Sequence, residues 1–252
     1  MKVVIFTSNA IRHRFVANSI TRNVNDALII SECKKSDSID TEDDAQSPII
    51  NEHFKLRYLT EKKIFSGNDY FSGKTLPLIY KEANLKSTFE IIKNFMPDLM
   101  FVFGSSILKE PLLSLVKPHR FINLHLGLSP YYRGSGTNFW PFVNKELQYV
   151  GSTILHIDER IDTGDIIAHV RPKFQIGDDV HSVGCKVIKD SVSCILKIIN
   201  LVKEGKELQR VKQWKVENER YYRTVDFTEE SLILYKKNLE NQLIENYLKK
   251  PK

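Results

Sequence analysis

Two polar residues stand two positions apart in an otherwise apolar stretch, Phe121-Ile-Asn-Leu-His125. We expect this stretch to be a β-strand, in which alternate side chains point to the same face, so that Asn123 and His125 lie side by side. Burying two such groups is unfavourable unless they have partners or a purpose. An imidazole transfers protons near neutral pH, and an amide donates hydrogen bonds to a developing oxyanion. The alternative is a core histidine that is hydrogen-bonded to a neighbouring asparagine.

An acidic turn follows further along the chain, Asp158-Glu-Arg-Ile-Asp-Thr-Gly-Asp165, between two apolar segments. By itself it is ordinary hairpin chemistry, because Asp and Gly both favour turns. Beside the Asn-x-His strand, however, Asp162 could bring a carboxylate to the imidazole of His125. Such a carboxylate stabilises the protonated imidazole and fixes its tautomer, which suits proton transfer. Asn, His and Asp without a nucleophilic Ser or Cys indicate direct attack by a substrate amine on an acyl donor.

These residues need a scaffold, and the apolar pattern supplies one. Residues 2–7 predict a strand that is buried on both faces, followed by a helix to about Arg22 with Ser8 or Asn9 as its N-cap, and by a second strand over 26–31. This order opens a doubly wound α/β sheet, whose ligands bind beyond the carboxyl ends of the strands. Asn123 and His125 lie near such an end, and the glycine-rich segment 126–136 after them is suited to wrapping a ligand.

The remaining pattern completes an α/β domain over residues 1–204 and a small C-terminal subdomain over 205–252. We expect strands at 99–103, 150–157 and 165–170. We expect helices over 87–96, over 111–116 and from Asp178 or Asp179 to Gly205. Residues 34–48 predict a mobile surface loop, and 49–85 show no clean period, with helical packing favoured. Beyond Leu208 we expect two short extended pieces and one amphipathic helix from Leu232 to Tyr247, which docks on its own domain or forms a dimer seam.

The composition is that of an ordinary globular protein, with 42% hydrophobic and 27% charged residues in 252. The net charge of +6 is mild, and the lysines at 249, 250 and 252 read as a solvated tail rather than a nucleic-acid site. Three cysteines without metal-type spacing indicate reduced thiols. The first apolar run is too short for a signal peptide or a membrane span. We therefore expect a cytoplasmic protein without a metal, a nucleic-acid partner or a membrane.

The two motifs together, Phe121 to Gly136 and Ile157 to Ile167, resemble the core of the 10-formyltetrahydrofolate-dependent formyltransferases. The resemblance covers about residues 98–178 well and the first strand and helix loosely. It implies a doubly wound, mostly parallel, Rossmann-like sheet and a catalytic set of Asn123, His125 and Asp162. It also implies a folate pocket in which backbone groups surround the pterin. The pocket residues that it implies are Ile107, Leu108, Asp158, Glu159, Arg160 and Ile161. The family's usual Leu-Leu-Pro appears here as Leu128-Ser129-Pro130, which leaves the local shape of the pocket open.

The same resemblance implies a mechanism. The acceptor amine attacks the formyl carbon carried on N10 of the folate. Asn123 and protonated His125 stabilise the oxyanion, while Asp162 supports His125 and helps to move a proton from the incoming amine to the leaving nitrogen.

The acceptor is suggested by less specific features. The turn from Thr7 to Phe15 joins a strand to a helix and predicts an anion site, although an N-capped surface helix explains it as well. This turn lacks the glycines of the glycinamide ribonucleotide enzymes and the Gly-Thr-Pro start of the methionyl-tRNA enzymes. The sequence from Asn123 to Trp140 is most similar to that of formyltransferases that act on a nucleotide-linked amino sugar of the 4-amino-4,6-dideoxyhexose type. In such an enzyme, Tyr or Trp side chains could stack on the base of the nucleotide. The substrate-binding candidates are Ser8, Asn9, Arg12, His13 and Arg133.

Four alternatives remain open. They are a glycinamide ribonucleotide formyltransferase, an enzyme similar to methionyl-tRNA formyltransferase, a formyltetrahydrofolate hydrolase that uses the same three residues on water, and a non-enzymatic binding module on this fold. The resemblance also makes a homodimer plausible.

Overall fold

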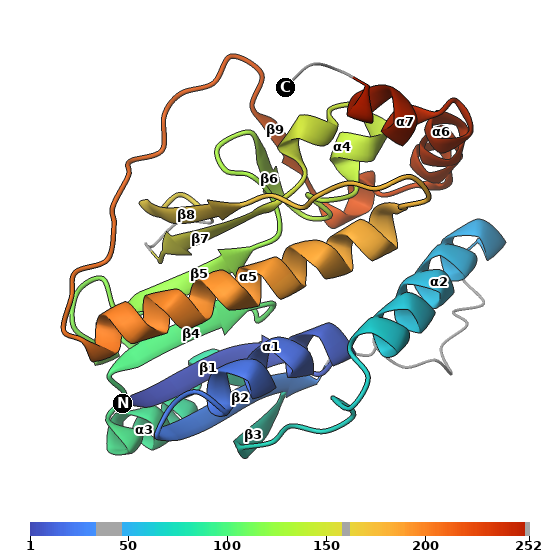
Figure 1. Ribbon diagram of the computed structural model, residues 1–252. Coiled ribbons are helices and arrows are strands. Elements are labelled where there is room, and N and C mark those ends of the chain that lie inside the picture. Colours follow the sequence, from blue (N-terminus) through green and yellow to red (C-terminus); the bar gives the residue numbers. More distant parts are fainter. Residues whose placement is uncertain (34–46, 158–161, 250–252) are drawn as a thin grey trace.

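A seven-stranded sheet is the centre of the structure. The computed structural model describes residues 1–33, 47–157 and 162–249. Within these residues the strand order is β3-β2-β1-β4-β5-β7-β8 (Figure 1). The first five strands in this order run parallel, and β7 and β8 are antiparallel to their neighbours. The strands are β1 (Lys2–Ser8), β2 (Asp26–Cys33), β3 (Lys74–Ile79), β4 (Leu99–Phe103), β5 (Phe121–His125), β7 (Ser152–His156) and β8 (Ile166–Val170).

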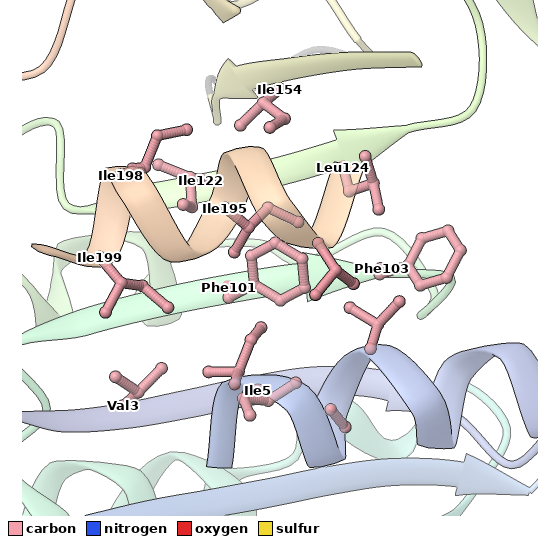
Figure 2. Close-up of a cluster of buried hydrophobic side chains, with 14 of the residues drawn as sticks. Val3, Ile5, Phe101, Phe103, Ile122, Leu124, Ile154, Ile195, Ile198 and Ile199 are labelled. Atoms are coloured by element: carbon pink, nitrogen blue, oxygen red, sulfur yellow. The ribbon is translucent and has the colours of Figure 1, made fainter. Parts of the chain in front are cut away.

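Helices cover both faces of this sheet, as the continuous apolar strands require. On one face α1 (Ile11–Thr21) and α5 (Val180–Lys203) pack on alternate residues of the strands, and Figure 2 shows Ile195, Ile198 and Ile199 of α5 among side chains of the sheet strands. On the other face α3 (Lys86–Phe95) and the short turns η2 (Glu82–Asn84) and η3 (Leu112–Leu115) cover the second set. The predicted doubly wound α/β fold is confirmed.

The start of α1 differs from the prediction. The N-cap is Ala10, and no side chain caps the helix, so the expected cap at Ser8 or Asn9 is wrong. The reason is that Ser8 is still the last residue of β1 and directs its hydroxyl to the ring of His13.

The segment without a clear period contains one helix and one strand. The helix α2 (Pro48–Ile64) confirms the preference for helical packing, and Ser47 and Pro48, expected in a loop, are its N-cap and first residue. Residues 34–46 of that predicted loop lie outside the described part. The strand β3 was not predicted, because it is an edge strand whose side chains are mostly exposed and which contains Pro77.

The chain after α5 returns to the first domain and packs on it. The capping box of Asp179 and Ser182 begins α5 as predicted. Beyond it, β9 (Arg220–Tyr222) pairs in parallel with β6 (Tyr132–Gly134). The expected single helix is two, α6 (Glu229–Glu240) and α7 (Leu243–Leu248), because Gln242 adopts a left-handed backbone with φ of 58°. A subdomain boundary near residue 204 stays a prediction.

The helix α6 docks on its own molecule rather than projecting from it. Leu232 and Tyr235 are buried against α4 (Trp140–Val143), and Asn238 donates to the carbonyls of Phe142 and Val143. The favoured docking is confirmed, and the homodimer stays a prediction. The three cysteines are free thiols. Of the helices in the described residues, none has the length and apolarity needed to cross a bilayer.

Candidate active site

The predicted Asn, His and Asp meet at the end of β5. Asn123 and His125 project from the same face, where the parallel half of the sheet meets the antiparallel strands β7 and β8. Asp162 lies in the turn between β7 and β8. Its Oδ1 accepts from Asn123 Nδ2 at 3.1 Å, and its Oδ2 lies 3.2 Å from His125 Nδ1. One carboxylate thus orients both other groups.

The imidazole of His125 is buried and held at both nitrogens. Its Nε2 donates to the carbonyl of Tyr132 at 3.1 Å, while Nδ1 faces the carboxylate of Asp162. A neutral ring donates to only one of these acceptors, whereas an imidazolium donates to both. Gly127 leaves room for the ring, because a Cβ at this position would lie 2.6 Å from His125 Nε2. These contacts and the glycine together hold the ring in one orientation.

The turn that carries Asp162 has an unusual backbone conformation. Asp162 has φ of 52°, a region that residues other than glycine adopt at a cost in free energy. Gln213 stabilises it, since its Nε2 donates to the carbonyls of Asp162 at 2.8 Å and of Gly164 at 2.9 Å. A segment distant in sequence thus holds the carboxylate in place.

Arg133, a predicted substrate-binding residue, completes this support. Its Nη2 donates to Gln213 Oε1 at 2.8 Å, and its Nη1 pairs with Glu219 at 2.8 Å. The side chain is not among those of the described residues that line the cavity. Its charge is directed at Glu219 behind the turn, and its role in binding substrate stays a prediction.

A large cavity opens in front of Asn123, His125 and Asp162. Its volume of about 1660 Å³ exceeds that of a site for one drug-sized ligand. Its walls come from the start of α1, from α2, from the segment after β4, from residues 134–140 and from the first turns of α5. Residues 223, 224 and 227 of the C-terminal part line it as well.

Part of the turn that was predicted to bind an anion lies in this wall, and its function stays a prediction. Arg12 donates through Nη1 to both oxygens of the buried Glu61, at 3.1 and 3.0 Å, and Arg57 approaches the same carboxylate at 3.9 Å. His13 is buried, accepts at Nδ1 from the amide of Ser8, and stacks on Phe103. Asn9 lies in the same turn, outside the cavity wall. Ser8, Arg12 and His13 line the cavity, and two guanidiniums share one carboxylate there.

Comparison with known proteins identifies the family. Residues 1–199 match the model of the formyl transferase family. The chain belongs to this family. It is 30% identical over 138 residues to a methionyl-tRNA formyltransferase from Desulforamulus reducens, covering 54% of this chain and 42% of the relative. A methionyl-tRNA formyltransferase from Clostridium tetani is 29% identical over 168 residues, covering 65% and 51%. The chain therefore spans about half the length of these relatives or less.

Solved structures share the fold. A 4-N formyltransferase from Francisella tularensis superimposes with a TM-score of 0.59 at 22% identity, covering 94% of this chain and 87% of that one. The N-formyltransferase from Helicobacter canadensis, in complex with folinic acid and dTDP-3-aminofucose, gives 0.58 at 15% identity, covering 94% and 80%. The predicted formyltransferase fold is confirmed, and the family membership supports 10-formyltetrahydrofolate as the formyl donor.

Only part of the predicted folate pocket lies within the described residues. After β4, Ile107 is more than half exposed and Leu108 is buried, and both line the cavity. The buried Glu32 fixes this segment, because it accepts from the amide of Ser106 at 2.6 Å and from the amide of Lys81 at 2.9 Å. An apolar side chain beside an anchored backbone suits a flat heterocycle. Asp158, Glu159, Arg160 and Ile161 lie outside the described residues.

Sequence reasoning missed two groups of residues around this site. Glu32 and Glu61 are buried carboxylates, and a single acidic residue in a strand or helix gives no signal of what it will meet. Gln213 reaches Asp162 from a segment without any motif. Of the Tyr and Trp side chains suggested to stack on a base, Trp140 stacks on Tyr222 with ring centroids 4.0 Å apart.

Proposed function

We propose that this member of the formyl transferase family transfers the formyl group of 10-formyltetrahydrofolate to the amine of a nucleotide-linked amino sugar of the 4-amino-4,6-dideoxyhexose type. One observation carries the chemical part of the proposal. Asp162 holds Asn123 and His125 together on a cavity large enough for a donor and an acceptor at once.

Each group has a task that follows from its geometry. Asn123 keeps a second N–H beyond the one donated to Asp162, and this N–H is available to the oxygen of the formyl group as negative charge develops. The His125 imidazolium adds positive charge on the same side. Asp162 keeps that imidazolium in place and accepts a proton, directly or through water, from the attacking amine. This proton passes to N10 as its bond to the formyl carbon breaks, so that tetrahydrofolate leaves as a neutral amine. The donor supplies an activated formyl carbon, so no covalent bond to the protein is needed.

The choice of acceptor rests on the cavity wall outside the matched region. Residues 223, 224 and 227 line the cavity but lie beyond the residues 1–199 that match the family. We assign acceptor recognition to this part. A methionyl-tRNA acceptor is the second candidate, because the sequence identity of 30% to a methionyl-tRNA formyltransferase favours it.

A direct assay tests the proposal. The purified protein is mixed with 10-formyltetrahydrofolate and, separately, with dTDP- and UDP-linked 4-amino sugars, glycinamide ribonucleotide, methionyl-tRNA or no acceptor. We expect formylation of an amino sugar and release of tetrahydrofolate in that reaction alone. Release of tetrahydrofolate without an acceptor refutes a transferase in favour of a hydrolase, and formylation of another acceptor only refutes the sugar assignment.

A further inference from the structure

A row of three side chains crosses the sheet at His125. His125 on β5 lies opposite Thr153 on β7, and Thr153 lies opposite His169 on β8, with antiparallel pairing at both steps. Directly opposed residues of antiparallel strands project from the same face of a sheet. Thr153 is fully buried in the middle of this row. The register therefore places a hydroxyl and a second imidazole on the face from which His125 projects.

Thr153 holds the turn that follows β5. Its Oγ1 donates to the carbonyl of Gly127 at 2.7 Å and accepts from the amide of Ser129 at 2.9 Å. A threonine hydroxyl has one donor and two acceptor positions, so it makes both bonds at once. One hydroxyl on β7 thus fixes the chain on both sides of Leu128.

His169 holds the same turn from the next strand. Its Nε2 donates to the carbonyl of Ser129 at 2.8 Å. Burial lowers the pKa of His169, the bond to Ser129 opposes this effect, and Arg171 adds to it. The ring is therefore neutral near pH 7, with its one N–H at Nε2. Ser129 is held at its amide by Thr153 and at its carbonyl by His169.

The turn determines where the hydrogen-bond acceptor of His125 lies. The carbonyl of Leu128, in the middle of the turn, accepts from the amides of Tyr131 at 2.9 Å and Tyr132 at 3.0 Å. The carbonyl of Tyr132 in turn accepts from Nε2 of His125 at 3.1 Å. A displacement of the turn would therefore move the carbonyl on which the imidazole depends.

This carbonyl decides which nitrogen of His125 always carries a proton. A carbonyl oxygen only accepts, so the contact with Tyr132 keeps a proton on Nε2. The hydrogen bond at one ring nitrogen fixes the state of the other. Nδ1 is then the nitrogen that gains or loses a proton, and it lies 3.2 Å from the carboxylate of Asp162.

We propose that Thr153 and His169 are positioning residues for His125, which hold the turn 127–132 and thereby the carbonyl that keeps the proton on Nε2. This inference rests on the proposed function, in which the charge of His125 stabilises the oxyanion. Neither side chain is among those of the described residues that line the cavity. Both act through His125 and not by contact with a substrate.

Nitrogen NMR of the His125 ring in the free protein tests the positioning, with the signals assigned by their loss in His125→Gln. In the wild type, Nε2 gives the signal of a protonated nitrogen in a single state. Thr153→Val keeps the shape of the side chain but removes both hydrogen bonds, and the His125 signals shift or divide between two states. Thr153→Ser keeps the hydroxyl and restores the wild-type signals. His169→Leu and His169→Gln form a second such pair, because glutamine retains an N–H donor.

Ser152 supplies the matched control. It precedes Thr153 on β7 and is equally buried, but its hydroxyl bonds to that of Ser191 on α5, at the opposite face of the sheet. Ser152→Ala thus removes a buried hydrogen bond from the same strand, and the His125 signals stay as in the wild type. Unchanged signals in Thr153→Val or in His169→Leu overturn the proposal, and so does an equal change in Ser152→Ala. A wild-type Nε2 without a proton overturns it whether or not the variants fold.

Kinetics separate positioning from contact with the ligands. With the acceptor that the wild type formylates, we expect Thr153→Val and His169→Leu to lower kcat about tenfold or more, with both KM values within about threefold, because a small displacement of a reacting group mainly affects the chemical step. A raised KM with unchanged kcat contradicts positioning.

The NMR measurement involves no formyl transfer, so the two proposals fail separately. If His125 responds to Thr153→Val but no amino sugar is formylated, the proposed function alone is refuted. If an amino sugar is formylated while His125 does not respond to Thr153→Val, the positioning alone is refuted.

Discussion

Asp162 is the residue that holds the other two proposed catalytic groups. Each of its carboxylate oxygens holds one of them, and its own backbone adopts a conformation with φ of 52°. Asp is among the residues that tolerate this region best, because its short side chain hydrogen-bonds locally. The spacing of Asn123 and His125 and the acidic turn were sufficient to predict that the three residues could meet, while the resemblance implied their catalytic role.

Asp162→Asn tests this dependence. We expect kcat for formyl transfer to fall roughly 10²–10⁴-fold, because a neutral amide stabilises the imidazolium poorly and cannot accept the amine proton. Steady-state kinetics measure the effect, with circular dichroism to confirm the fold. Asp165→Asn is the control, since Asp165 lies in the same turn but pairs with Arg210. A loss of less than tenfold in Asp162→Asn contradicts the role assigned to this carboxylate.

The contact between His53 and His181 shows what a sequence leaves out at this scale. His53 lies in a segment without a period and His181 at a helix start, 128 positions later. Neither has a partner motif, and the reason to consider them together is that α2 and α5 pack side by side. The same holds for Gln213, whose amide has no recognisable target until the chain has folded.

At the scale of elements, the segment between α5 and β9 acts as a support for the active site. Gln213 connects it to the turn of Asp162, and Arg133 on β6 holds Gln213 in place. The segment has little regular structure of its own, so its effect on the site depends on these side-chain contacts.

Gln213→Ala removes this support. We expect kcat to fall up to about 10²-fold, since a displacement of the carboxylate by about 1 Å costs roughly this much, while the KM values change little. Lys212→Ala, at the exposed neighbouring position, is expected to behave as wild type. Equal losses in kcat and in affinity for both substrates would instead indicate that the segment contacts the ligands.

A second connection holds β9 to β6. Glu146 accepts from Arg220 Nε at 2.9 Å and Nη2 at 2.8 Å, and the hydroxyl of Tyr132 donates to the same carboxylate. Arg220 lowers the pKa of Glu146, with Tyr132 acting in the same direction. Burial and the hydrogen bond to Glu146 raise the pKa of Tyr132, so that its phenol remains a donor.

The lowered pKa of Glu146 gives a prediction for stability. The carboxylate stabilises the folded protein above the ordinary carboxyl pKa of 4.5, and this contribution is lost as pH falls below it. At pH 7 we expect Glu146→Gln to reduce the free energy of unfolding by about 1–2 kcal/mol, and the difference from wild type to shrink at pH 4 and below. Urea unfolding at several pH values measures it. Glu204→Gln, in an exposed ion pair, serves as the control. A difference that grows on acidification contradicts the assignment.

The elements that sequence predicted well are those with one strong signal. The continuous apolar runs of β1, β4 and β5 and the capping box of α5 were sufficient. The strand β3 shows neither a continuous run of apolar residues nor an alternation of apolar and polar residues. It lies at the edge of the sheet, where it pairs with β2 alone and its side chains are mostly exposed. The break between α6 and α7 was not predicted, because the apolar residues keep their three- and four-residue spacing across Gln242. The backbone of Gln242 is left-handed and ends the helix.

At the scale of the whole molecule, the C-terminal part is joined to the rest through a shared core. Leu232 is fully buried among residues of α4 and α5, whereas the next residue, Ile233, is 55% exposed. The two side chains are similar in size and differ mainly in what surrounds them.

This pair gives a matched test of the shared core. Leu232→Ala is expected to lower the free energy of unfolding of the whole protein by about 2–5 kcal/mol, and Ile233→Ala by well under 1 kcal/mol. Chemical unfolding followed at once by fluorescence and circular dichroism measures both. Separate transitions in the wild type would show that the C-terminal part folds as an independent unit, and similar losses in the two variants would contradict the packing. Sedimentation of the wild type tests the predicted homodimer.

The position of the C-terminal part also determines when the protein acquires its site. A ribosome releases Asn123, His125 and Asp162 well before Gln213 and Phe227, by tens of residues. The sheet and the proposed catalytic side chains can therefore form on a nascent chain in which Asp162 still lacks its support and the cavity still lacks part of its wall. The cavity is complete only when the late segment folds back over a sheet that is already in place.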